Sequence, residues 1–131
     1  MNVTELRLGN LVCIEDCPQR ICVVSGIADK KISLIFAGAN VKTNVRPEQV
    51  QGIPITGELL EKLGFSYLYS LWRKTERGRS MVVGIERTFV SIEAFEDRLN
   101  DSRCTCHGIK YLHQLQNLFF SIAKHELEMN I

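Results

Sequence analysis

The strongest constraint on the fold lies near the C-terminus, where apolar residues recur at three- and four-residue spacing. These residues are Leu112, Leu115, Leu118, Phe119 and Ile122. Such spacing predicts a helix with one buried side, and each large side chain buried there stabilises the fold by about 1.5–3 kcal/mol. The other side is expected to carry Lys110, His113, Gln114, Asn117, Ser121 and Lys124. No Ser, Thr, Asp or Asn stands at the usual cap position, so the start near Gly108 is left open.

The first part of the chain has a different pattern, with short β-rich runs between residues 6 and 51. Four or five such runs follow one another roughly every ten residues, separated by turns rich in Gly, Pro and Asn. Gly9–Asn10 suits a tight bend at the entry to a strand. The pattern predicts a small SH3-like antiparallel β-barrel over residues 1–52.

The rest of the chain, residues 53–131, is predicted to form a helix–antiparallel sheet–helix lobe. Pro54 indicates an extended connector, and Thr56 is expected to cap a helix over 57–63 that ends at Gly64. Strand-like runs follow at 65–74, 81–85 and 88–92; residues 94–100 suit either a helical turn or a loop, and 103–107 a last short strand. The predicted fold class is therefore α+β, with the two lobes packed as one compact unit.

Composition excludes a general attraction to polyanions. The 131 residues carry a net charge of +1, so binding to nucleic acid would require a local basic patch. No apolar run approaches the length that spans a bilayer, and the N-terminus is polar, so we expect a cytoplasmic protein without a membrane partner. The five cysteines are expected to be free thiols in a reducing compartment.

Three blocks of the chain stand at its beginning, middle and end. They are Glu-Leu-Arg-Leu-Gly-Asn-Leu-Val at 5–12, Ile-Pro-Ile-Thr at 53–56 continuing to Gly-Phe at 64–65, and Tyr-Leu-His-Gln-Leu-Gln-Asn-Leu-Phe-Phe at 111–120. Together these blocks resemble a family of small uncharacterised proteins from gut anaerobic bacteria and their prophages. The family tends to have Gly where this chain has Lys124, and the five cysteines lie outside the matched pattern. The resemblance implies a phage or mobile-element origin, but it brings no activity, ligand or cofactor.

The cysteines and histidines could in principle hold a metal or form a thiol nucleophile. The candidate metal ligands are Cys13, Cys17 and Cys22 in one group and Cys104, Cys106 and His107 in another. Their C-x3-C, C-x4-C and C-x-C-H spacings differ from the paired C-x2-C of common zinc sites, so no metal is expected. A nucleophile would need Cys104 or Cys106 beside His107 or His113, yet no oxyanion-hole motif or acidic partner is recognisable. We therefore expect no enzyme and no cofactor.

Two other groups of residues are candidates for binding. On the C-terminal helix, His113 and Asn117 share a polar ridge with Gln114 and Gln116, which could bind a peptide backbone or bases. The alternative is that this ridge satisfies buried backbone groups of the protein itself.

The second group is a basic hairpin around Gly78, formed by Trp72, Arg73, Lys74, Arg77 and Arg79. It could contact phosphates while the indole stacks on a base, or it could be a solvated hairpin tip.

The sequence thus favours a non-enzymatic binding or accessory protein with a protein partner. A nucleic-acid-associated protein is the first alternative, and a metal-binding protein or thiol enzyme is the second. The oligomeric state is not indicated.

Overall fold

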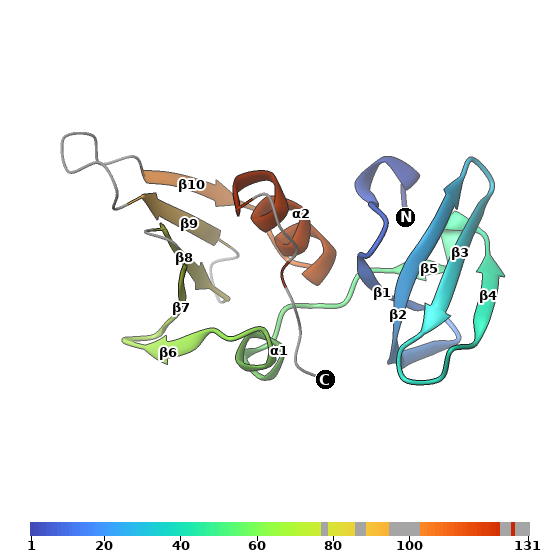
Figure 1. Cartoon of the computed structure of the whole chain (residues 1–131), viewed down its shortest axis with the longest axis horizontal. Helices are drawn as coiled ribbons and strands as arrows, with labels where there is room; N and C mark the ends of the chain where they lie inside the picture. The colour runs from blue at the N-terminus through green and yellow to red at the C-terminus, as the bar shows by residue number, and fades with distance from the viewer. Residues whose placement is uncertain (77–78, 86–88, 95–102, 124–126, 128–131) are drawn as a thin grey trace. The chain divides into compact units, whose positions relative to one another are not determined.

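The computed structural model describes residues 1–76, 79–85, 89–94, 103–123 and 127. In this part of the chain the fold is α+β and mostly strand, with two five-stranded antiparallel sheets and two α-helices (Figure 1). Spatial contacts divide the chain into two compact units. The first unit is Met1–Pro54 with Tyr111–Glu126, and the second is Ile55–Lys110 with Leu127–Ile131.

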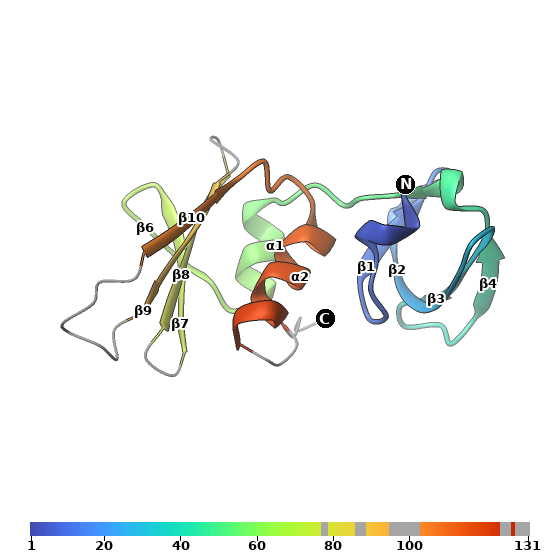
Figure 2. The same ribbon diagram turned by 90° about the horizontal axis from the view of Figure 1, so that it is seen from above.

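The sheet of the first unit is antiparallel and curved (Figure 2). Its strands are β1 (Leu11–Ile14), β2 (Cys17–Ala28), β3 (Lys31–Phe36), β4 (Lys42–Val45) and β5 (Val50–Gln51). Their order across the sheet is β4-β3-β2-β1-β5. Among the described residues no ladder joins β4 to β5, so the predicted closed barrel is observed as an open, curved sheet.

The core of the first unit comes from inward-facing positions of these strands. Val24 lies opposite Leu34 on β2 and β3, and both are fully buried. The cluster contains Leu6, Val12, Cys22, Val24, Ile32, Leu34 and Val50. The 3-10 turns η1 (Val3–Glu5) and η2 (Pro47–Gln49) flank the strands. The Met1 ammonium group donates to the Pro47 carbonyl at 2.8 Å, which ties the two turns together.

The second unit begins with the short helix α1 (Gly57–Lys62), as its sequence signals predict. The Thr56 hydroxyl accepts a hydrogen bond from the Leu59 N–H at 3.3 Å, so it caps the helix. Gly64 follows with φ of +89°, a left-handed conformation that glycine adopts without strain.

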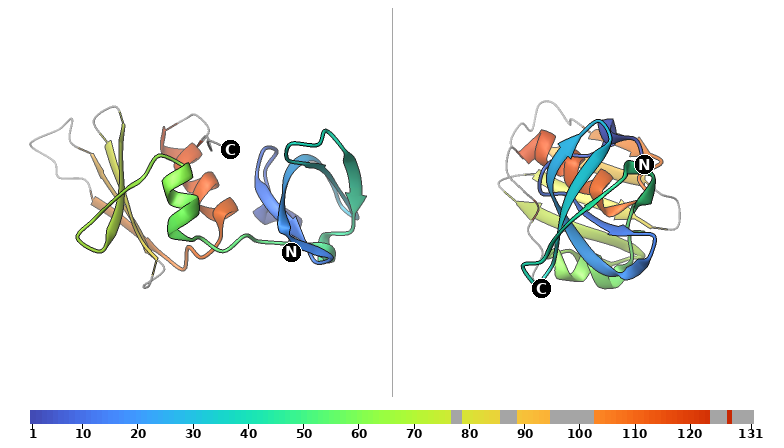
Figure 3. Two further views of the ribbon diagram at one scale, coloured as in Figure 1. Left: turned by 90° about the horizontal axis from the view of Figure 1, so that it is seen from below. Right: turned by 90° about the vertical axis from the view of Figure 1, so that its right-hand side faces the viewer.

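The sheet of the second unit has the order β10-β9-β8-β7-β6 (Figure 3). Its strands are β6 (Ser66–Leu68), β7 (Leu71–Glu76), β8 (Arg79–Gly84), β9 (Phe89–Ala94) and β10 (Arg103–His107). The last strand is confirmed at its predicted place, whereas the ambiguous segment lies almost wholly outside the described residues. The run expected as one strand over 65–74 is instead folded into the β6–β7 hairpin.

The helix α2 (Leu112–Ala123) is confirmed, and the side chains of Leu112, Leu115 and Phe119 are buried. Its start is explained by Gln114, whose side-chain oxygen accepts from the Tyr111 N–H at 3.0 Å. This glutamine takes the place of the Glu or Gln of a capping box, although no Ser or Thr completes the box. By spatial contacts α2 groups with the N-terminal strands, and the expected division into 1–52 and 53–131 stays a prediction.

Candidate functional site

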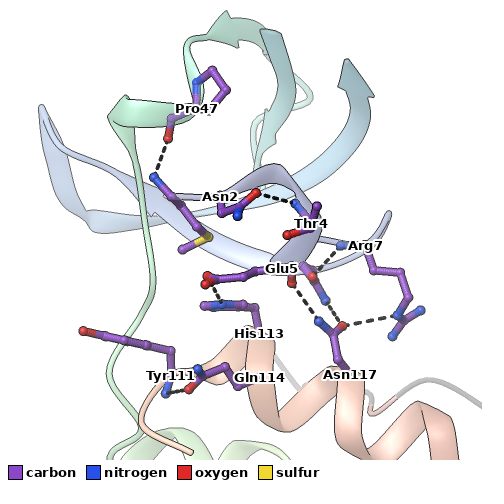
Figure 4. Close-up of polar contacts among 11 residues, drawn as sticks. Asn2, Thr4, Glu5, Arg7, Pro47, Tyr111, His113, Gln114 and Asn117 are labelled. Carbon is purple, nitrogen blue, oxygen red and sulfur yellow. Dashed lines mark hydrogen bonds and ion pairs between the residues drawn. The ribbon is translucent and has the colours of Figure 1, made fainter. Parts of the chain in front are cut away.

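The polar ridge of α2 lies against the turn that precedes β1 (Figure 4). The Asn117 side-chain oxygen accepts from the Asn10 amide at 2.8 Å and from the Arg7 Nε at 3.2 Å. Its side-chain amide donates to the Glu5 carbonyl at 3.0 Å. Because Asn10 is fully buried, Asn117 supplies a hydrogen bond that water cannot replace.

The neighbouring Gln116 continues this pattern on the same side of the helix. Its side-chain oxygen accepts from the Leu11 N–H at 2.8 Å, and its amide donates to the Gly9 carbonyl at 3.4 Å. Gly9 has φ of +90°, which bends the chain so that both backbone groups reach the glutamine. The Arg7 guanidinium also lies 4.1 Å from the centre of the Phe120 ring. The amides of α2 therefore have partners within the first unit.

His113 is the exception on this ridge. It is 1 % exposed, and neither ring nitrogen has a hydrogen-bond partner among the described residues. The Glu5 carboxylate is 3.9 Å from its Nε2, and the Tyr111 ring stacks on it at 6.0 Å between centroids. Burial lowers the pKa of His113, and the nearby carboxylate opposes this shift more weakly. The imidazole is therefore neutral near pH 7.

These contacts show how the residues of the predicted ridge are used within the protein itself. Gln114 caps its own helix, Asn117 holds the turn before β1, and His113 is enclosed. A role for these residues in binding a partner stays a prediction, but the geometry gives each amide a structural task.

The structure describes the side chains of only some residues of the predicted basic hairpin. Trp72 is half-buried, and its indole leaves no room for a side chain at Gly57, where an added Cβ would lie 2.7 Å from it. The Lys74 ammonium donates to the Leu63 carbonyl at 2.7 Å and so ties the end of α1 to the sheet. Arg73 is exposed. Arg79 is described only by its main chain in β8, and Arg77 lies outside the described residues.

The other turn of β7 carries an exposed apolar surface that the sequence did not single out. Tyr67 and Leu68 are each 61 % exposed and Tyr69 is 88 % exposed. Tyr69 and Ser70 both have positive φ, of 51° and 65°. Positive φ at both central residues is typical of a type I′ hairpin turn, which usually contains Asn or Gly. We call Tyr67–Ser70 the aromatic hairpin; its only signal in the sequence is the density of aromatic residues after Phe65.

Two of the described cysteines, Cys13 and Cys22, are buried thiols. Burial raises the pKa of the Cys13 and Cys22 thiols, which keeps them protonated and poorly nucleophilic. Cys17 and Cys106 are partly buried, and Cys104 lies in β10 opposite Ile92. Within the described ranges no three His, Cys, Asp or Glu residues come close enough to hold a metal ion.

Comparison with protein-family models, with curated proteins and with solved structures finds no match to this chain. In the part of the chain that the structure describes, no helix has the length and apolar character needed to cross a membrane.

Proposed function

We propose that this chain is a non-enzymatic binding or accessory module of phage or mobile-element origin, and that the aromatic hairpin is its contact surface for a protein partner. The resemblance of the three sequence blocks supports the proposed phage or mobile-element origin. Buried, free thiols at Cys13 and Cys22 agree with the expected cytoplasmic location.

The observation that carries the proposal is the exposure of three consecutive apolar or aromatic side chains on a turn of unfavourable backbone conformation. A Tyr or Ser residue at positive φ costs on the order of 1–3 kcal/mol, and such strain is concentrated at functional sites. Tyr69 and Ser70 hold this conformation side by side, and Tyr69 is 88 % exposed. Exposed tyrosines on a hairpin turn are suited to protein contacts, because they bury a large area at a small cost in side-chain conformational entropy.

We also propose that the first unit is an SH3-like module. It is supported by the strand order β4-β3-β2-β1-β5, by the curvature of the sheet, and by the 3-10 turn η2 directly before β5. Such a module would serve as the scaffold of the protein.

The test is affinity capture from a lysate of the bacterial host, carried out with the full-length chain and two variants. We expect the wild type to recover a defined partner, and the Tyr69→Ser variant to lose it at unchanged melting temperature. The matched control is Val41→Ser, which removes a side chain that is 52 % exposed in the other unit. Equal recovery by all three proteins would overturn the assignment of the surface.

A nucleic-acid-associated protein is the second candidate, favoured by the charge of the β7–β8 hairpin. Residues 71–80 contain four of the sixteen Lys and Arg residues and one of the fifteen Asp and Glu residues, a local charge of +3. The remaining chain therefore carries −2, so the basic character is concentrated in one place. A gel-shift titration with single-stranded DNA at several salt concentrations tests this candidate, and no shift at low salt removes it.

A further inference from the structure

Strand β6 is an edge of the second sheet, and it differs from the other three sheet edges that the described residues form. Edge strands are commonly protected against added strands by charged residues, by Pro or by being very short. β4 contains Lys42, the sequence of β10 contains Arg103, and β5 has only two residues. β6 is itself short, with three residues, so the contrast rests on charge and not on length. β6 is Ser-Tyr-Leu, with no charge and no Pro, and the side chains of Tyr67 and Leu68 are largely exposed.

The register of the hairpin indicates which main-chain groups face outward. Leu68 and Leu71 flank a two-residue turn, so they are the pair that exchanges hydrogen bonds. In an antiparallel ladder the next pair, Tyr67 with Trp72, does not exchange them. The N–H and C=O of Tyr67 therefore point away from β7, along the edge where no described strand lies.

We propose that β6 takes an extended segment of a partner protein as an added strand, paired through the main chain of Tyr67. This inference rests on the proposed function, because it names the way in which the aromatic hairpin binds. Addition of a strand to a sheet edge is a recurring mode of peptide recognition. The main chain supplies affinity and the side chains of alternate residues supply selectivity.

The two faces of the hairpin indicate the chemistry of the added strand. On one face Tyr67 lies beside Trp72, with ring centroids 5.0 Å apart, and this face suits an aromatic or aliphatic side chain. On the opposite face the small Ser66 pairs with the exposed Arg73. An acidic side chain placed next to Ser66 meets the guanidinium across this small residue. The partner segment is therefore extended and apolar, with one acidic residue beside the aromatic position.

The probe is a fluorescein-labelled, end-capped peptide, Thr-Val-Tyr-Glu-Thr, titrated into the ¹⁵N-labelled full-length protein. We expect weak binding, with a Kd of roughly 0.1–1 mM as suits a small transient contact, and the largest amide shift at Tyr67. Methylation of the backbone nitrogen of the central Tyr should abolish binding. Replacement of Glu by Lys should weaken it about three- to fivefold, the range of an exposed ion pair.

Protein variants give the complementary test. Arg73→Glu should reverse the preference between the Glu and Lys peptides, whereas Lys42→Glu on the β4 edge should leave it unchanged. Tyr67→Pro removes the outward donor at a position where an edge strand accepts Pro, and should abolish binding. Unchanged binding of the N-methylated peptide, or a peptide response confined to other residues, overturns the inference.

The experiments distinguish a failure of this inference from a failure of the proposed function. If Tyr69→Ser loses the captured partner while no peptide binds at β6, the surface is correct and the added strand is wrong. If single-stranded DNA shifts the Tyr67 amide and the peptides do not, the occupant is nucleic acid and the inference is overturned.

Discussion

At the scale of single residues, the side chain of Asn117 connects the last helix to the turn before β1. It bonds to the Asn10 amide, the Arg7 guanidinium and the Glu5 carbonyl. Truncation leaves the buried Asn10 amide without its partner, so Asn117→Ala is expected to lower the free energy of unfolding by about 2–3 kcal/mol. Urea denaturation followed by circular dichroism measures this change.

The control for this variant lies one turn further along the same helix. Ser121 is exposed, and its hydroxyl donates only to the Leu118 carbonyl of its own helix. Ser121→Ala should change the free energy of unfolding by less than about 0.5 kcal/mol. Equal effects of the two substitutions would contradict the role given to Asn117.

His113 gives the protein a dependence of stability on pH. Its folded pKa lies below the unfolded value of about 6.5, so the unfolded chain binds the proton more readily. The stabilising contribution is complete above pH 6.5 or so and is lost as the pH falls from there through the folded pKa. We expect the urea concentration at the unfolding midpoint of the wild type to be lower at pH 5 than at pH 7.

The variant His113→Phe keeps an aromatic ring at this buried position but cannot take up a proton. Its urea midpoint should fall less over the same pH range, and the difference from the wild type isolates the contribution of this imidazole. Parallel curves for the two proteins would show that the burial of His113 has no energetic consequence.

At the scale of secondary-structure elements, the aromatic hairpin contains backbone strain that a glycine residue can relieve. Ser70 has φ of 65°, which costs a residue with a side chain about 1 kcal/mol more than glycine. Ser70→Gly should raise the free energy of unfolding by this amount, measured as an increase in melting temperature. Binding at the hairpin should persist, because Tyr67, Leu68 and Tyr69 are unchanged.

The same substitution four residues earlier should have the opposite sign. Ser66 lies in β6 and does not have positive φ, so glycine there only adds freedom to the unfolded chain. Ser66→Gly is expected to lower stability by about 0.5–1 kcal/mol. A gain of stability at both positions would remove the argument from backbone strain.

The elements themselves were largely predictable from local patterns. The spacing of leucines identifies α2, and Thr56 with Gly64 marks the bounds of α1. The turn at Tyr69–Ser70 could not be predicted in this way, because it lacks the Asn or Gly that usually signals a type I′ turn. The partners of Gln116 and Asn117 were also unpredictable, since they lie more than a hundred residues away in the sequence. Long-range polar pairing of this kind leaves no periodic pattern.

At the scale of the whole molecule, parts of all three sequence blocks meet within the first unit. Tyr111 forms an antiparallel bridge with Pro54, and the Leu112 N–H donates to the Ile53 carbonyl at 2.8 Å. The Tyr111 ring also covers Gly52 so closely that an added Cβ would lie 2.6 Å from the ring. The blocks that define the resemblance are therefore used, at least here, to join distant parts of the chain.

This contact predicts a coupled pair of substitutions. Gly52→Ala forces the Tyr111 ring to move and should lower the free energy of unfolding by about 1–3 kcal/mol. In a Tyr111→Ala background the same change should cost less than about 0.5 kcal/mol, because the ring is gone. A double-mutant cycle of urea midpoints measures the coupling, and an additive result would contradict the observed packing.

The grouping of α2 with the N-terminal strands also has a consequence for synthesis on the ribosome. Residues 1–54 emerge first, but the side chains that bond to the Leu11 N–H and to Asn10 are translated more than a hundred positions later. In the nascent chain, the first unit therefore lacks these hydrogen bonds while residues 55–110 are made. A chain stalled on the ribosome before Gln116 and Asn117 have left the exit tunnel would therefore present a first unit that lacks these two hydrogen bonds.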